Sequence, residues 1–155
     1  MRSRVLFVLA ILILMIPAGV MAAPVPQKIT ITIKEFSFTP NRVVLPADVP
    51  VQLTLVNSGK MKHEFWLYAA PTETGINMRQ YAQENTYFRF RDIGETEVAI
   101  RGQGSTTGTG VFWVTVEPGK SVTISFTTKK KGTFEFACLL EGHYESGMKG
   151  TLVVK

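Results

Sequence analysis

The stretch GTFEFACLLEGHYESGMKGTLVV, residues 132–154, contains two segments with the apolar pattern of β-strands. Phe134 and Phe136 alternate with polar residues in the first segment, and residues 151–154 close the chain with a second short apolar run. Alternation with period two is typical of half-buried strands. The stretch therefore predicts a strand, a loop over residues 138–149 and a second strand.

The same period continues through most of the chain outside this stretch. Apolar residues alternate with polar ones in short runs, separated by turns that contain Gly, Pro or Asn. The predicted strands cover 29–38, 43–45, 51–55, 65–68, 111–116 and 122–126. Short strands in this number, with almost no helical periodicity, predict an all-β fold that forms an antiparallel sandwich.

Residues 70–110 depart from the strand pattern, because they are richer in polar residues and end in a Gly, Ser and Thr-rich run. A segment of this length is too long for a plain loop. We expect a short helix over residues 76–83 and an edge strand over 87–90 within it. The segment is interpreted as an insertion with structure of its own or as a surface that faces a partner.

The N-terminus predicts a secretory signal peptide over residues 1–22. Two arginines precede an apolar run over residues 5–16, which is shorter than the roughly 20 residues of a transmembrane helix, and small residues follow it. An uncleaved anchor is the alternative. We expect an exported protein, periplasmic or otherwise extracytoplasmic, with one domain over residues 23–155 and no stable membrane insertion after cleavage.

Composition excludes several classes of protein. The 155 residues are 45% hydrophobic, which excludes a disordered chain. The net charge is +5, and without the two arginines of the signal peptide the chain keeps 15 basic against 12 acidic residues. The sequence lacks the clusters of basic residues with interleaved aromatics that nucleic-acid binding requires, so no nucleic-acid partner is expected.

Cys138 is the single cysteine of the chain, which is unusual for an exported protein. It is interpreted as a buried inert thiol, a nucleophile or a metal ligand. Cys138, His143 and Met148 follow one another at five-residue intervals on the predicted loop. A thiolate, an imidazole and a thioether together make a soft site that suits copper. His63, the other histidine of the chain, follows a turn at the start of a strand and is a candidate fourth ligand.

With these residues in place, the sequence resembles the cupredoxins, the family of blue copper proteins. Residues 36–40, FSFTP, resemble the first-strand signature of that family, and residues 51–63 resemble its strand leading through an Asn and a Gly to the first ligand. The resemblance implies a Greek-key β-sandwich of about eight strands that holds one type 1 copper ion. It also places the 70–110 insertion between the first and the second copper ligand.

The resemblance carries over to four positions of this chain. It implies His63, Cys138 and His143 as the strong equatorial ligands and Met148 as the weak axial ligand. The implied function is electron transfer, with Cu(I)/Cu(II) cycling between exported or membrane-bound redox partners such as cytochromes or respiratory complexes. These partners would dock transiently on an apolar patch around His143, and we expect the protein to be a monomer.

Two residues depart from the family pattern. Glu64 follows the first histidine, where many relatives have Asn or Ser, and Glu141 stands before the Gly-His pair, where many have Pro. The carboxylate of Glu64 either hydrogen-bonds across the ligand loops or points outward. Leu139 and Leu140 are interpreted either as part of the docking patch or as core residues.

Other functions remain to be weighed against electron transfer. A copper-binding protein for delivery or sequestration is the main alternative, because composition does not separate a carrier from a chaperone. An enzyme is not expected, since two histidines leave none for a second, catalytic copper. A binuclear copper centre is excluded because the loop has no second cysteine.

Overall fold

The computed structural model describes residues 24–88, 99–102 and 113–155. The predicted signal peptide over residues 1–22 lies outside the described residues. The described part contains one helix and ten strands. They are β1 (Gln27–Lys34), β2 (Ser37–Thr39), β3 (Arg42–Leu45), β4 (Pro50–Asn57), β5 (His63–Ala69), α1 (Met78–Glu84), β6 (Ala99–Gly102), β7 (Trp113–Val116), β8 (Ser121–Thr127), β9 (Gly132–Ala137) and β10 (Lys149–Val154).

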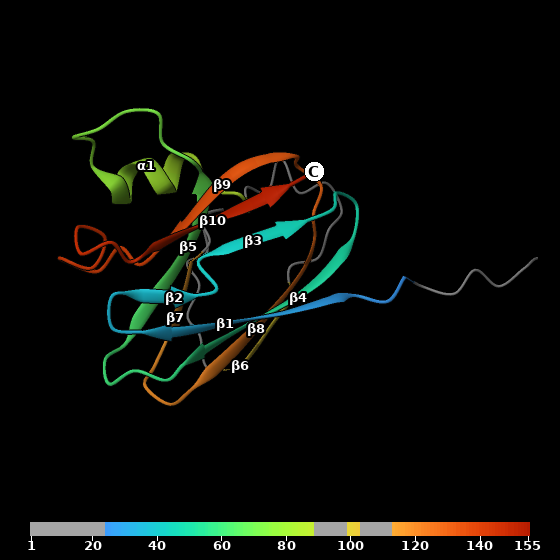
Figure 1. The fold of residues 1–155 in the computed structure, drawn as a ribbon, viewed down its shortest axis with the longest axis horizontal. Helices are drawn as coiled ribbons and strands as arrows, with labels where there is room; N and C mark the ends of the chain where they lie inside the picture. The colour runs from blue at the N-terminus through green and yellow to red at the C-terminus, as the bar shows by residue number, and fades with distance from the viewer. Residues whose placement is uncertain (1–23, 89–98, 103–112) are drawn as a thin grey trace, which may run out of the picture.

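The strands form two five-stranded sheets that pack as a sandwich (Figure 1). The first sheet has the order β2-β1-β4-β8-β6 and the second the order β3-β10-β9-β5-β7. The predicted all-β sandwich is confirmed. The prediction of antiparallel pairing needs correction at two places, because β1 pairs with β4 and β3 pairs with β10 in parallel. Alternation reports which face of a strand is buried, but not the direction of its neighbour.

The first predicted strand, 29–38, is broken into β1 and β2. Phe36 has a left-handed backbone, with φ of 59°, and the chain reverses there, so that Phe38 pairs with Ile33. This reversal and the four-residue β6 raise the strand count above the expected eight. The turn also places the side chain of Phe36 at one end of the sandwich, where 45% of it is exposed.

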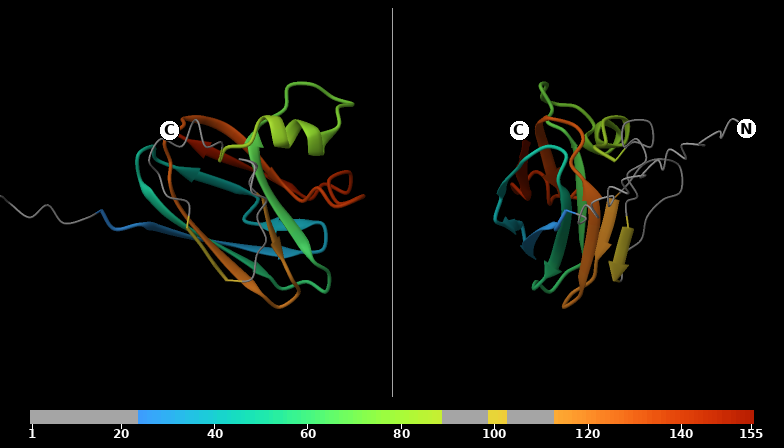
Figure 2. Two further views of the ribbon diagram at one scale, coloured as in Figure 1. Left: turned by 180° about the vertical axis from the view of Figure 1, so that it is seen from behind. Right: turned by 90° about the vertical axis from the view of Figure 1, so that its right-hand side faces the viewer.

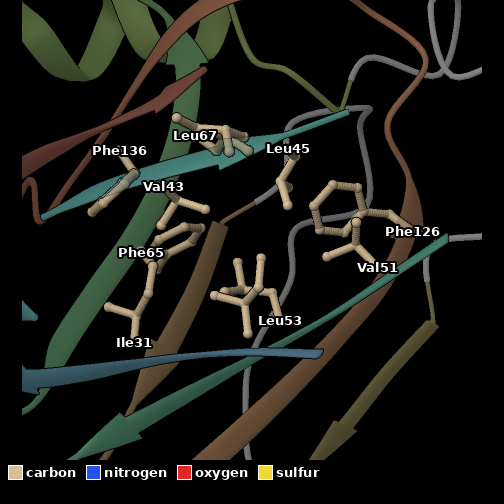
Figure 3. Close-up of a pocket in the computed structure, with 11 residues that line it drawn as sticks. Ile31, Val43, Leu45, Val51, Leu53, Phe65, Leu67, Phe126 and Phe136 are labelled. Atoms are coloured by element: carbon tan, nitrogen blue, oxygen red, sulfur yellow. The ribbon is translucent and has the colours of Figure 1, made fainter. Parts of the chain in front are cut away.

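The core lies between the two sheets and is built from the alternating apolar positions. Figure 3 shows side chains from both sheets, among them Ile31, Phe65 and Phe136, pointing into this space. The cavity that remains among them measures about 10 Å³, roughly the room for one water molecule. The sandwich is therefore a closely filled framework rather than a container for a ligand.

The described part of the 70–110 segment is joined to both sheets. The predicted helix is confirmed as α1, with the side chain of Asn77 accepting a hydrogen bond from the Gln80 N–H as its N-cap. β6 pairs with β8 at the edge of the first sheet. Tyr87 and Phe88 form a turn rather than the expected strand and bury their rings in the core. The rest of that predicted strand, 89–90, lies outside the described residues.

Several connections between strands meet at one end of the sandwich. Figures 1 and 2 show the β9–β10 loop, the β1–β2 turn and the β4–β5 turn gathered there, with α1 beside β5. Within residues 24–88, 99–102 and 113–155, no helix has the length and apolar character needed to cross a bilayer. The end of the sandwich where the connections meet holds the predicted site residues.

Candidate metal centre

The structure brings together three of the four predicted ligands from segments far apart in the sequence. His63 begins β5, Cys138 follows β9, and His143 lies in the β9–β10 loop. Their ligand atoms lie within 4.8 Å of one another. The Sγ of Cys138 is 3.4 Å from Nδ1 of His143 and 4.0 Å from Nδ1 of His63.

Met148 lies beside these three residues. It is fully buried, its N–H donates to the His143 carbonyl at 3.0 Å, and its carbonyl accepts from the Cys138 N–H at 3.1 Å. The His143 N–H in turn donates to the Leu140 carbonyl. These backbone hydrogen bonds close the β9–β10 loop on itself and hold Cys138, His143 and Met148 near one another. The role of Met148 as the weak axial ligand stays a prediction.

The three donors fit a single soft metal ion. Bonds of about 2.0–2.3 Å to nitrogen and sulfur let one ion bridge atoms about 4 Å apart. The His63 ring is fully buried; among the residues that the structure describes, its Nε2 has no hydrogen-bond partner and its Nδ1 has only the distant sulfur. A buried imidazole without partners is costly unless another group uses its lone pair. One sulfur and two nitrogens are a donor set that suits copper.

Comparison with known proteins agrees with this geometry. The family model of the cupredoxin-like domain matches residues 4–83, about half of the chain. The chain belongs to the cupredoxin family. Copper is therefore its cofactor, and the cluster of His63, Cys138 and His143 is where the described residues offer donors for it.

Individual relatives of this cupredoxin are copper proteins. It is 28% identical to the copper-resistant cuproprotein CopI of Pseudomonas aeruginosa, over 86% of this chain and 79% of that protein. It is also 28% identical to auracyanin-B of Chloroflexus aurantiacus, over 76% of this chain but only 47% of that protein. The chain thus spans less than half of the auracyanin-B sequence.

Solved structures show the same fold. A structure of auracyanin B matches 88% of this chain and 93% of its own length, with a TM-score of 0.58 and 24% identity. A multicopper oxidase from Campylobacter jejuni matches 86% of this chain over 31% of its own length, with a TM-score of 0.54 and 13% identity. At these identities the likeness concerns the fold alone.

The position of His63 in this cupredoxin is set by the turn before it. Asn57 is fully buried, and its side-chain amide donates to the carbonyls of Met61 at 2.7 Å and Val116 at 2.8 Å. Its side-chain oxygen accepts from the Gly59 N–H at 2.9 Å. The carboxylate of Glu35 accepts from the N–H groups of Lys60 and Met61 on the other side of the turn. The turn is therefore held from both sides immediately before the ligand.

Glu64 connects β5, the strand that begins with His63, to the sulfur of Cys138 and to α1. Its N–H donates to Sγ of Cys138 at 3.3 Å. Its carboxylate points inward and accepts from Nε1 of Trp66 at 2.7 Å and from Nη2 of Arg79 at 3.0 Å. The same Nη2 donates to the Leu139 carbonyl at 2.8 Å. The open question about Glu64 is answered: it bonds across the loops, with Arg79 as intermediary.

Burial sets the protonation of the metal-free donors. It raises the pKa of the Cys138 thiol, while the N–H groups of Glu64 and Leu140 oppose this rise. Burial, followed by the nearby His143, lowers the pKa of His63. A lowered pKa keeps the His63 ring neutral, so that its lone pair is available to a metal.

Of the four predicted ligands, His143 lies nearest to the surface, although only 8% of it is exposed. The edge of the Phe36 ring contacts its imidazole, with centroids 5.3 Å apart. Leu139 is buried in the smaller apolar cluster that also contains Trp66, so it is a core residue in this structure. Leu140 packs on the main core but is only partly buried. Glu141 is exposed and lines a groove between α1 and the ligand loop.

Sequence reasoning missed Arg79 and Phe36. Arg79 lies 15 residues from Glu64 in a segment without strand periodicity, and no motif links the two. Phe36 fits the alternation of a continuous strand, which hid the turn at that position. The Glu64 departure was the one signal in the sequence that pointed towards an unusual partner.

Proposed function

We propose that this cupredoxin is a mononuclear type 1 copper protein that transfers single electrons between exported or membrane-bound redox partners. The observation that carries the proposal is the buried cluster of one sulfur and two imidazole nitrogens within 4.8 Å. His63, Cys138 and His143 would be the strong ligands and Met148 the weak axial one.

The chain's contribution is to keep the donors in place. Bound copper supplies one-electron redox chemistry by changing between Cu(I) and Cu(II). His63 and Cys138 adjoin neighbouring strands of one sheet, and the backbone bonds of Met148 hold the loop closed. A framework of this kind fixes the donors in one arrangement for both oxidation states, which favours fast electron transfer.

The surface around His143 supports transient docking. Phe36 and Met61 are exposed by 45% and 41%, and both belong to turns at the site end of the sandwich. Small apolar patches suit redox complexes, which bury little area and dissociate quickly. We propose that cytochromes or membrane respiratory complexes dock there, that the protein works as an exported monomer, and that it catalyses no reaction of its own.

Spectroscopy of the purified protein tests the site. Addition of Cu(II) is expected to give an intense thiolate-to-copper absorption band and a narrow hyperfine splitting in the electron paramagnetic resonance spectrum. Cys138→Ser is expected to lose both, because it removes the thiolate. A colourless wild-type protein after copper addition would overturn the proposal.

Copper delivery or sequestration is the second candidate, and the copper-resistant relatives favour it. The two functions differ in kinetics. A carrier exchanges electrons rapidly with a second copy of itself and retains its metal, whereas a delivery protein releases Cu(I) readily to an apo-acceptor. Measuring the self-exchange rate and the rate of Cu(I) transfer on one preparation decides between them.

A further inference from the structure

We propose that Arg79 is a positioning residue that clamps the β9–β10 loop, which carries His143, to β5, which begins with His63. In this way α1 closes the metal centre from outside. The inference rests on the proposed copper function. It makes α1, in the 70–110 segment between His63 and Cys138, part of the metal centre. Its basis is one side-chain nitrogen, Nη2, which donates to Glu64 on β5 and to the Leu139 carbonyl in the loop.

The two partners of Arg79 flank the sulfur directly. Glu64 donates its own N–H to Sγ of Cys138, and Leu139 is the next residue after Cys138. Arg79 therefore connects the residue that hydrogen-bonds the sulfur with the residue that follows it. If the loop moves away from β5, both bonds of Nη2 cannot be kept.

The surroundings hold the guanidinium in this position. It lies over the Trp66 ring, 5.3 Å from the centroid, and Trp66 stacks on Trp113 with an interplanar angle of 9°. Trp66 also donates to the same oxygen of Glu64 that Arg79 contacts. The Glu64 side chain is only 10% exposed, so its charge needs these two donors. The Arg79 side chain is 42% exposed along the groove beside the loop.

A purely structural ion pair would stabilise the whole fold without controlling access to the sulfur. The clamp predicts a local effect instead. Without Arg79, the loop separates from β5 more often while the sheets remain folded, because the strand pairing of β5 and β9 does not involve the guanidinium. The thiol of Cys138, which is fully buried, then reacts more readily with a reagent in solution.

The test measures the rate at which the metal-free protein reacts with a disulfide reagent, 5,5′-dithiobis(2-nitrobenzoic acid), at rising low urea concentrations. We expect R79M to raise this rate about 10–100-fold. The rate should change little with low urea, because local opening exposes little surface. E64L, which removes the acceptor, should act similarly, and the R79M/E64L double variant no more than either single one, since both break one connection. K129M, which removes an exposed ion pair with Asp48, should leave the rate unchanged.

An unchanged rate in R79M would overturn the clamp, as would a rate increase that only follows the loss of global stability. If R79M does not fold, R79K keeps the stem and charge but not the planar fork, and its rate is expected to rise too. With copper bound, R79M should also shift the thiolate band and release the metal faster to a chelator. The thiol measurement needs no copper, so a protected thiol in a chain that never turns blue refutes the proposed function alone.

Discussion

Gly150→Ala tests how tightly the end of the ligand loop is packed. Gly150 lies in β10, two residues after Met148, and pairs with Phe136 on β9. A Cβ at this position would collide with the Phe136 ring and lie 2.5 Å from the Asn41 carbonyl oxygen. Ordinary carbon contacts begin at about 3.5 Å, so both contacts must lengthen by about 1 Å.

Neither the Phe136 ring nor the Asn41 carbonyl can move without losing stabilising contacts. Phe136 is buried between aromatic rings, stacked on Phe65 with centroids 5.5 Å apart and edge-on to Phe38 at 5.3 Å. The Asn41 carbonyl accepts the Thr151 N–H at 2.8 Å, and a shift of the strand breaks this bond. Overpacking costs about 1–3 kcal/mol and a lost hydrogen bond about 1 kcal/mol, against a gain of about 0.5 kcal/mol from the stiffer unfolded chain. The expected loss is therefore about 1.5–3.5 kcal/mol.

Urea unfolding of the metal-free protein measures this loss. With a slope of about 2 kcal/mol per molar urea, the midpoint should fall by about 0.8–1.8 M. Gly119→Ala is the matched control, because its φ of 69° strains alanine but nothing lies within 4 Å of the added carbon. It should cost about 1 kcal/mol, or about 0.5 M. A Gly150→Ala midpoint equal to or above that of Gly119→Ala would refute the packing argument.

Two further substitutions test the turn before His63. Asn57→Ala removes two hydrogen bonds that the Asn57 side chain donates and one that it accepts, so it should lower the free energy of unfolding by about 2–4 kcal/mol. The control Ser58→Ala should change the free energy of unfolding by less than about 0.5 kcal/mol. Equal losses in the two variants would contradict the role of Asn57. The N–H of Lys60, helped by other backbone hydrogen bonds, lowers the pKa of the Glu35 carboxyl. The ionised carboxylate therefore stabilises the fold at pH values above the ordinary pKa of glutamate. This stabilisation is lost as the pH falls through the lowered pKa. Glu35→Gln should therefore be less stable than wild type at about pH 7 and should approach it at about pH 3, as thermal melts across this range would show; a difference that does not vary with pH would contradict the assignment.

The sandwich was largely predictable because burial of one face forces period two on the sequence. β4 shows this directly, since its residues alternate strictly between buried and partly exposed. The direction of neighbouring strands was not predictable, because a parallel and an antiparallel neighbour ask for the same alternation. The turn at Phe36 was also hidden, since an aromatic residue in a left-handed conformation carries no turn signature.

The ligand cluster could be predicted from residue types, because cysteine and histidine are scarce in this chain. Cys138 and His143 stand five residues apart on one loop, and His63 was the only other imidazole available. The structure places these three together. Spacing alone did not show that the His63 ring would be fully buried, or that Asn57 would tie the turn before it to β7.

The departure at Glu64 and the helix in the 70–110 segment are best understood as one feature. A carboxylate beside a copper ligand is unfavourable when buried, because removing its charge from water costs several kcal/mol. Here Trp66 and Arg79 supply the donors that make this burial tolerable, and Arg79 comes from α1. The helix thus supplies one of the two donors that the buried glutamate receives. With the usual Asn or Ser at that position, a loop-to-strand bond would need no cation, and the helix would lose its electrostatic reason to contact β5.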